Sequence, residues 1–160
     1  MKKHPNKGIS LVEVIVAAAI IGSAVLSTMG VYANLSKLSY QNMPKIQANY
    51  LAEEGIEAVR TLRDAGWSSK ISKLSTTTAY SLYWNGTNWT ATTTSILIDN
   101  LFSRAFTLSD VVRDANFNIA SSSGTYDSGS KMVSVTVSWP DRDGTSTKNL
   151  QGYIFNTFNN

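Results

Sequence analysis

The sequence predicts an α+β fold in which a long N-terminal helix, embedded in a membrane along its first half, packs on a small antiparallel β-sheet. Three observations support this prediction. An uncharged apolar stretch follows a short basic N-terminus, an amphipathic helical pattern follows the apolar stretch, and the remaining half is rich in Ser, Thr, Asn and aromatic residues. Threonine and aromatic residues favour strands.

The apolar stretch is long enough to cross a bilayer. No charged side chain occurs from Val14 to Ser36, and a helix of roughly 23 residues rises about 35 Å. Lys2, Lys3 and Lys7 all precede this stretch, which by the positive-inside tendency keeps the N-terminus cytoplasmic and sends the remainder across. We therefore expect a single-pass cell-membrane protein whose bulk lies on the far side.

The change in polarity comes at Gly8, in front of the apolar stretch. A cut there would remove only the basic leader and leave the apolar helix on the mature protein. An ordinary secretory signal has a shorter apolar region that is closed by a small-residue cleavage site. Small residues around Ser23 and Ser27 keep that alternative open.

A single carboxylate, Glu13, stands at the start of the apolar stretch, although charge carries an insertion cost in membranes. Cleavage after Gly8 would create an α-amino group on Ile9, and such a group is largely cationic at neutral pH. Glu13 follows four residues later on the same helix face, where opposite charges about 4 Å apart attract by roughly 4 kcal/mol at an effective dielectric near 20. Spacing alone leaves three options for Glu13: its own Ile9 amine, that of a neighbouring subunit, or the head-group layer.

The leader ending in Gly8, the apolar Ile9-Ser10-Leu11-Val12 and the glutamate at the fifth place after the glycine resemble the type IV pilin superfamily, which includes pilins, minor pilins and the pseudopilins of type II secretion. The resemblance implies that a prepilin peptidase cuts between Gly8 and Ile9 and methylates the new amine of Ile9. It also implies that Glu13 docks each incoming subunit in register. The family most often carries phenylalanine in place of Ile9, so this sequence departs from the pattern there and at Ser10.

Two glycines, Gly22 and Gly30, weaken the apolar helix by about 1 kcal/mol each relative to alanine. Ser23, Ser27 and Thr28 lie between them, and their hydroxyls compete for backbone hydrogen bonds. The segment suits either a local loss of helicity, which the resemblance implies for assembled filaments, or close helix packing through small residues.

Beyond Ser36, the helix leaves the apolar zone. Pro44 is expected to kink or split it, with Asn42 available to cap a fresh start. An amphipathic pattern continues to Ala65, Gly66 suits the position that ends the helix, and Trp67 should fold back into the core. The expected apolar stripe of this second half consists of Ala48, Leu51, Ala52, Gly55, Val59 and Leu62.

The C-terminal part contains signals for four or five antiparallel strands. Residues 79–84 and 87–93 flank Asn85-Gly86, the favoured two-residue hairpin turn. Residues 101–112 suggest a further strand in which Arg104 intrudes. Apolar and hydroxyl side chains alternate over residues 133–139, which is the clearest half-buried strand.

The hairpin that follows this strand completes the expected sheet. Residues 140–144 form its turn and residues 148–155 return along the sheet. One face of the sheet should cover the apolar stripe of the helix. The whole chain then divides into a leader (1–8), a transmembrane and assembly half of the helix (9–36), an amphipathic half (37–66) and a β-rich globular domain (67–160). Motifs at residues 51–57 and 60–64, and the strand ending at Trp139, extend the resemblance to small bacterial minor-pilin-like proteins.

Composition gives no support for catalysis. The chain has no cysteine, and its single histidine, His4, lies in the leader. We find no nucleophile with a base beside it and no phosphate loop, so we expect no enzyme, no cofactor and no metal. Asp141-Arg142-Asp143-Gly144 begins like a calcium loop, but the later ligand positions fall on Thr145 and Gly152, which favours a plain hairpin turn.

Two surface motifs allow a functional interpretation beside a purely structural one. Asn85 and Asn88 each begin a glycosylation triplet, although such triplets arise readily in Asn/Thr-rich sequence. Tyr83, Trp84 and Trp89 would suit a stacking surface for sugar or single-stranded nucleic acid, whereas cross-strand pairing within the hairpin is the favoured interpretation. The net charge of +3 lies largely in the leader, which argues against a nucleic-acid partner.

These observations and the resemblance predict a structural subunit, a minor pilin or pseudopilin, of a bacterial type IV pilus or type II secretion-like filament. It would be processed after Gly8 and assembled through its N-terminal helix into a filament outside the cytoplasm. The implied partners are the prepilin peptidase, other pilin or pseudopilin subunits, the inner-membrane assembly machinery and membrane lipid. The alternative is a permanently membrane-anchored surface module that binds glycan or DNA, for which Glu13 would have no use.

Overall fold

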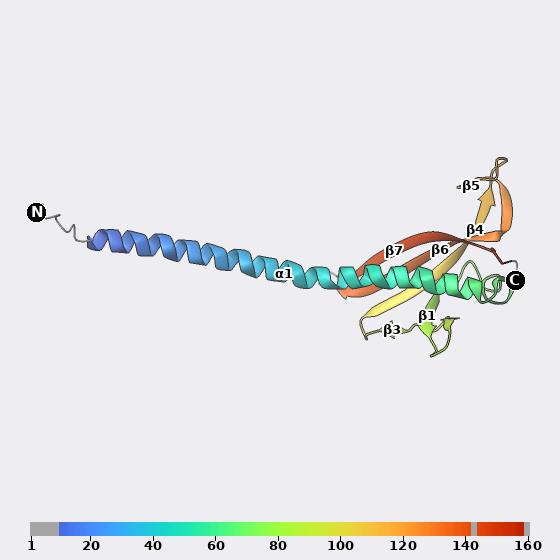
Figure 1. Ribbon diagram of the computed structural model, residues 1–160, viewed down its shortest axis with the longest axis horizontal. Coiled ribbons are helices and arrows are strands. Elements are labelled where there is room, and N and C mark those ends of the chain that lie inside the picture. The colour runs from blue at the N-terminus through green and yellow to red at the C-terminus, as the bar shows by residue number, and fades with distance from the viewer. Residues whose placement is uncertain (1–9, 142–143, 159–160) are drawn as a thin grey trace, which may run out of the picture. The chain divides into compact units, whose positions relative to one another are not determined.

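The computed structural model describes residues 10–141 and 144–158 and has the predicted α+β fold. Among the described residues, a 54-residue helix, α1 (Leu11–Asp64), comes first, and its C-terminal part packs on an antiparallel sheet of seven strands (Figure 1). The residues fall into two compact units, one up to Met43 and the other from Pro44 onward.

Helix α1 continues through Pro44, so the predicted split with a fresh start capped at Asn42 is wrong. Proline removes only one backbone hydrogen bond, and the turn that follows is held by packing, because Ala48 is already fully buried. The segment between Gly22 and Gly30 is helical too. Its hydroxyls bond inside the helix, as when Ser27 Oγ donates to the carbonyl of Ser23 at 2.8 Å.

The end of α1 agrees with the predicted position of its terminal glycine. The helix ends at Asp64, and Gly66 adopts a φ of +146°, which favours glycine over residues with a Cβ. The chain then turns back in a short π-helical segment, η1 (Trp67–Ile71), and both of its end residues are buried. Trp67 is therefore the first core residue beyond α1, as the sequence predicts.

All strand pairs in the sheet are antiparallel, and the main path has the order β2-β1-β4-β6-β7 (Figure 1). The two-residue strands β3 and β5 each pair with β4 and account for the excess over the four or five strands predicted. The strands are β1 (Tyr80–Trp84), β2 (Trp89–Thr92), β3 (Leu97–Ile98), β4 (Phe102–Arg113), β5 (Ile119–Ala120), β6 (Thr125–Asp141) and β7 (Gly144–Phe155).

Two turns differ from the prediction. Trp84 pairs with Trp89, so four residues connect β1 to β2 instead of the two-residue turn at Asn85-Gly86. The side chain of Asn85 explains the longer loop, because its Oδ1 accepts the backbone N–H groups of Thr87 and Asn88 at 3.0 and 2.8 Å. Strand β6 also runs on to Asp141, which pairs with Gly144, and therefore includes Pro140.

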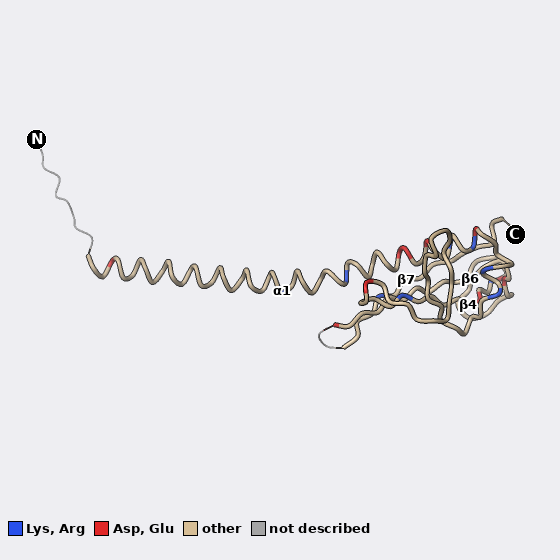
Figure 2. Tube along the Cα trace, turned by 90° about the horizontal axis from the view of Figure 1, so that it is seen from below, with Lys and Arg blue, Asp and Glu red and all other residues tan. Residues whose placement is uncertain are grey.

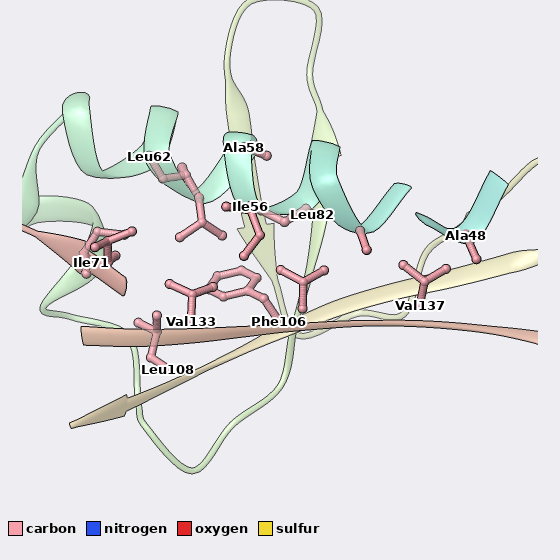
Figure 3. Close-up of a cluster of buried hydrophobic side chains, with 14 of the residues drawn as sticks. Ala48, Ile56, Ala58, Leu62, Ile71, Leu82, Phe106, Leu108, Val133 and Val137 are labelled. Carbon is pink, nitrogen blue, oxygen red and sulfur yellow. The ribbon is translucent and has the colours of Figure 1, made fainter. Parts of the chain in front are cut away.

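The core lies between the second half of α1 and one face of the sheet. The predicted stripe is confirmed at Ala48, Ala52, Gly55, Val59 and Leu62, while Leu51 is only partly buried. Ile56 and Ala58 are buried as well, and Figure 3 shows Ile56 pointing toward Phe106 of β4. The alternation predicted for residues 133–139 is confirmed, since the buried residues are Val133, Val135, Val137 and Trp139.

Of the three glycines in α1, only Gly55 lies in close contact with the sheet. A Cβ added to Gly55 would lie 2.7 Å from Cγ1 of Val135 and 3.2 Å from Cδ of Arg104. By contrast, a Cβ at Gly22 or Gly30 would meet no atom within 4 Å. Gly55 therefore has a packing role that the two earlier glycines do not share.

Candidate functional site

The first candidate site is the part of α1 from residue 11 to residue 43, which we call the apolar segment. Figure 2 shows that charged residues are absent over most of it. None of its side chains is buried, and the first buried residue of α1 is Ala48. Its large exposed hydrophobic residues are Leu11, Val12, Val14, Ile15, Val16, Ile20, Ile21, Val25, Leu26, Met29, Val31, Tyr32, Leu35, Leu38, Tyr40 and Met43.

Such a continuous exposed apolar surface requires a partner, because soluble proteins rarely expose contiguous apolar patches of more than a few hundred Å². Helix α1 is long and apolar enough to cross a membrane, which is consistent with a single-pass membrane protein. Lipid tails or another apolar helix would cover such a surface.

Glu13 lies in the first turn of α1 and is exposed. The turn begins at Ser10, whose carbonyl accepts the N–H groups of Glu13 at 3.0 Å and Val14 at 3.3 Å. A carboxylate is favourable there because the unpaired N–H groups of a helix start carry partial positive charge. Within residues 10–141 and 144–158, Glu13 makes no ion pair. Gly8 and Ile9, the predicted cleavage and methylation residues, lie outside the described residues.

A shallow hollow lies beside Glu13 and is lined by Val14, Ala17, Ala18 and Ile21 as well. Ala17 and Ile21 follow Glu13 at four-residue spacing, so they lie on its face of the helix. The small alanine side chains would let a second helix approach closely. A cation carried by that helix could then reach Glu13.

The aromatic residues of the β1–β2 hairpin follow the favoured interpretation, which is cross-strand pairing. The rings of Trp84 and Trp89 lie 5.8 Å apart and nearly edge to face. Trp89 is also covered by Arg104, whose Cζ lies 5.1 Å from the ring centroid. Tyr83 precedes Trp84 in the strand, so its side chain points to the opposite face. The three rings therefore do not form one stacking surface.

Sequence reasoning missed an ion pair that joins α1 to the sheet. Arg104 of β4 is almost completely buried, and its Nη1 forms an ion pair with Oε2 of Glu54 and donates to the carbonyl of Leu51 at 3.2 Å. The sequence signal was the position of Arg104 among alternating core residues. Its partner could not be identified from the sequence because Glu54 lies 50 residues away.

A second missed feature is a polar cluster where β4 and β6 lose their regular register. Asp110 pairs with Lys131 but Val111 pairs with Asp127, so residues 128–130 have no partner on β4. Oδ2 of Asp127 accepts the hydroxyl of Ser130 at 2.6 Å and Nε of Arg113 at 2.6 Å. The hydrogen bond from Ser130, followed by that from Arg113, lowers the pKa of Asp127.

This cluster borders a cavity of about 490 Å³, which is also lined by Phe117 and Tyr126. Phe117 is 80% exposed and has a positive φ of 64°. The loop between β4 and β5 is held by Asp114, whose Oδ1 accepts the backbone N–H groups of Asn116 and Asn118. The bond from the N–H of Asn118 is the largest cause that lowers the pKa of Asp114.

The β6–β7 hairpin contains the sequence that begins like a calcium loop. Arg142 and Asp143 lie outside the described residues, and Ser146 Oγ donates to Asp141 Oδ2 at 2.9 Å. Among residues 10–141 and 144–158, no group of three or more His, Asp or Glu side chains could hold a metal ion.

A long apolar helix packed on an antiparallel sheet is compatible with a pilin-like fold. No family model matches the chain, and neither a curated protein nor a solved structure matches it.

Proposed function

We propose that this chain is a structural subunit, a minor pilin or pseudopilin, of a type IV pilus or a type II secretion-like filament. The observation that supports the proposal most strongly is the apolar segment, which has no buried residue and carries a single carboxylate, Glu13, in its first turn. In a helix that only anchors a protein, this charge would contribute no more than its favourable interaction with the helix start, against an insertion cost, whereas a filament subunit also uses it for docking.

In this proposal the precursor is stored in the membrane through the apolar segment. Cleavage after Gly8 and methylation of Ile9 by a prepilin peptidase leave a cationic amine at the new N-terminus. Glu13 attracts the amine of a neighbouring subunit, and the alanines beside it allow the two helices to approach. Extraction into the filament then exchanges lipid contacts for helix contacts. Head-to-tail contacts of this kind do not close, so they produce fibres.

The sheet has a different task in this proposal, since it is the part that the filament would present to the outside. Its attachment to the helix must withstand extraction from the membrane. The buried stripe of α1, the close approach at Gly55 and the pair of Glu54 with Arg104 provide that attachment. These contacts all lie after Pro44, outside the apolar segment.

The first test is mass spectrometry of the N-terminus of the protein recovered from membranes, with and without an active prepilin peptidase. We expect a chain that starts at methylated Ile9 only when the peptidase is active. An intact Met1, or a cut beyond the apolar stretch near Ala33, would contradict the proposal and leave an anchored or secreted module.

The second test separates a filament subunit from an anchored module. Glu13→Leu should leave membrane insertion intact, because it makes the helix more apolar, but should abolish incorporation into sheared filaments. Glu53→Leu provides a control, since Glu53 is also an exposed helix glutamate with no ion pair in the described part of the chain. Normal incorporation of Glu13→Leu would refute the docking role of Glu13.

A further inference from the structure

We propose that the unit from Pro44 onward binds the phosphate group of an anionic phospholipid at a hollow between α1 and the β6–β7 hairpin. The hollow has a volume of about 280 Å³. This is slightly smaller than typical drug-sized ligand sites, which begin at about 300 Å³, and it suits a lipid head group. Its lining consists of Lys45, Asn49, Trp139, Ser146, Thr147 and Lys148.

The charges of the hollow favour an anion. Lys45 comes from α1 and Lys148 from β7, and both side chains are exposed. Neither lysine forms an ion pair with any residue in the ranges 10–141 and 144–158. The carboxylate of Asp141 on the same hairpin is held by Ser146 Oγ at 2.9 Å. Two lysines line this one hollow, and none of its described lining residues is acidic, so it would attract a phosphate oxygen.

The uncharged groups of the lining complete the donor set. Asn49 contributes an amide and Thr147 a hydroxyl, and both can donate to a phosphate oxygen. Trp139 is 4% exposed and adds an apolar wall. The combination of cations, neutral donors and one aromatic wall suits a head group whose phosphate is attached to a glycerol backbone.

The position of the hollow along the chain identifies a membrane lipid as the source of the phosphate. Tyr40 is of a residue type enriched at membrane interfaces, and Lys45 follows it by only five residues in the sequence. The four-carbon stem of a lysine can extend its ammonium group back toward the head groups. This step rests on the membrane insertion that the proposed function contains, but it does not depend on cleavage or filament assembly.

The test is native mass spectrometry of the full chain in detergent micelles, titrated with phosphatidylglycerol or with phosphatidylcholine of the same acyl chains. The attraction of one lysine to an anionic membrane surface corresponds to about a fivefold change in affinity, so two lysines give about thirtyfold. We expect the wild-type chain to retain one phosphatidylglycerol about thirtyfold more tightly than phosphatidylcholine. Lys45→Gln/Lys148→Gln should lose this preference.

The matched control is Lys70→Gln/Lys73→Gln. These two exposed lysines line another hollow, formed by the C-terminal end of α1, the segment that follows it and β2, and their removal changes the net charge by the same amount. We expect this variant to keep the preference for phosphatidylglycerol. Equal loss in both double variants would mean that net charge, and not the hollow, attracts the lipid, and would overturn the proposal.

Two further arms distinguish the outcomes. Inorganic phosphate at millimolar concentration should not displace the lipid, and displacement that depends on Lys45 and Lys148 would assign the hollow to free phosphate instead. Flotation with vesicles reports membrane insertion separately, and both the wild type and the Lys45→Gln/Lys148→Gln variant should float. A chain that fails to float contradicts the proposed function, whereas a floating chain without lipid preference contradicts only this inference.

Discussion

The ion pair between Glu54 of α1 and Arg104 of β4 should respond very differently to the loss of each partner. The Arg104 side chain is 3% exposed, whereas that of Glu54 is 49% exposed. Removing Glu54 leaves a buried cation without its counter-charge, and removing Arg104 leaves a carboxylate that water can reach. Glu54→Ala should therefore destabilise the protein more than Arg104→Met.

The magnitudes follow from the same burial. Breaking a fully buried pair costs about 3–5 kcal/mol, and because Glu54 is half exposed we expect Glu54→Ala to lower the free energy of unfolding by about 2 kcal/mol. Arg104→Met should cost no more than about 1 kcal/mol. It forfeits the contact with the Trp89 ring but also removes a charge that was costly to bury, and methionine fills much of the space.

The assay is urea unfolding of the full chain at constant detergent concentration, followed by tryptophan fluorescence. Glu54→Ala combined with Arg104→Met should be no less stable than Arg104→Met alone, because no buried charge is then left unpaired. Glu53→Ala, the neighbouring exposed glutamate, should change the free energy of unfolding by less than about 0.5 kcal/mol. Equal costs for the two single substitutions, or a larger cost for Arg104→Met, would refute the reasoning.

Three other substitutions test other features of the fold. Gly55→Ala should destabilise the protein despite the better helix propensity of alanine, because its Cβ would meet Val135 at 2.7 Å, and in urea unfolding Gly55→Ala should cost less in a Val135→Ala background than in the wild-type chain. Asp127 has a lowered pKa, so its contribution to stability is present above the ordinary value of 3.8 and disappears as the pH falls through the lowered pKa. Asp127→Asn should accordingly flatten the acid limb of a plot of unfolding free energy against pH, and an unchanged limb would assign the acid sensitivity to other groups. Phe117→Gly should raise the free energy of unfolding by up to about 1 kcal/mol, because a positive φ suits glycine, and a loss of stability would show that the exposed ring contributes packing.

The sequence was sufficient to predict the helix and the sheet because both follow from local patterns. Spacing of three and four residues marked the buried stripe of α1, and strict alternation over residues 133–139 marked strand β6, which lies between β4 and β7. The continuity of the helix at Pro44 was not predictable in the same way, since packing of the turn that follows outweighs a local preference. The partner of Arg104 and the irregular register beside Asp127 depend on residues that are distant in sequence.

Of the candidate sites, one can be predicted from the sequence and another cannot. The apolar segment and Glu13 are visible in the sequence because composition alone reveals an uncharged stretch that follows one carboxylate. The hollow of Lys45 and Lys148 is not visible, since it arises only when the β6–β7 hairpin is placed against α1.

The absence of any buried residue in α1 before Ala48 has a consequence for how this chain can change. Substitutions in the apolar segment remove no core contact, so they leave the folding energy of the sheet unit almost untouched, and core substitutions do not alter the exposed surface of that segment. Two selective demands therefore act on separate residues of one continuous helix. Variants can be sought independently at each, and the unit from Pro44 onward could be exchanged for a different domain without redesigning the apolar segment.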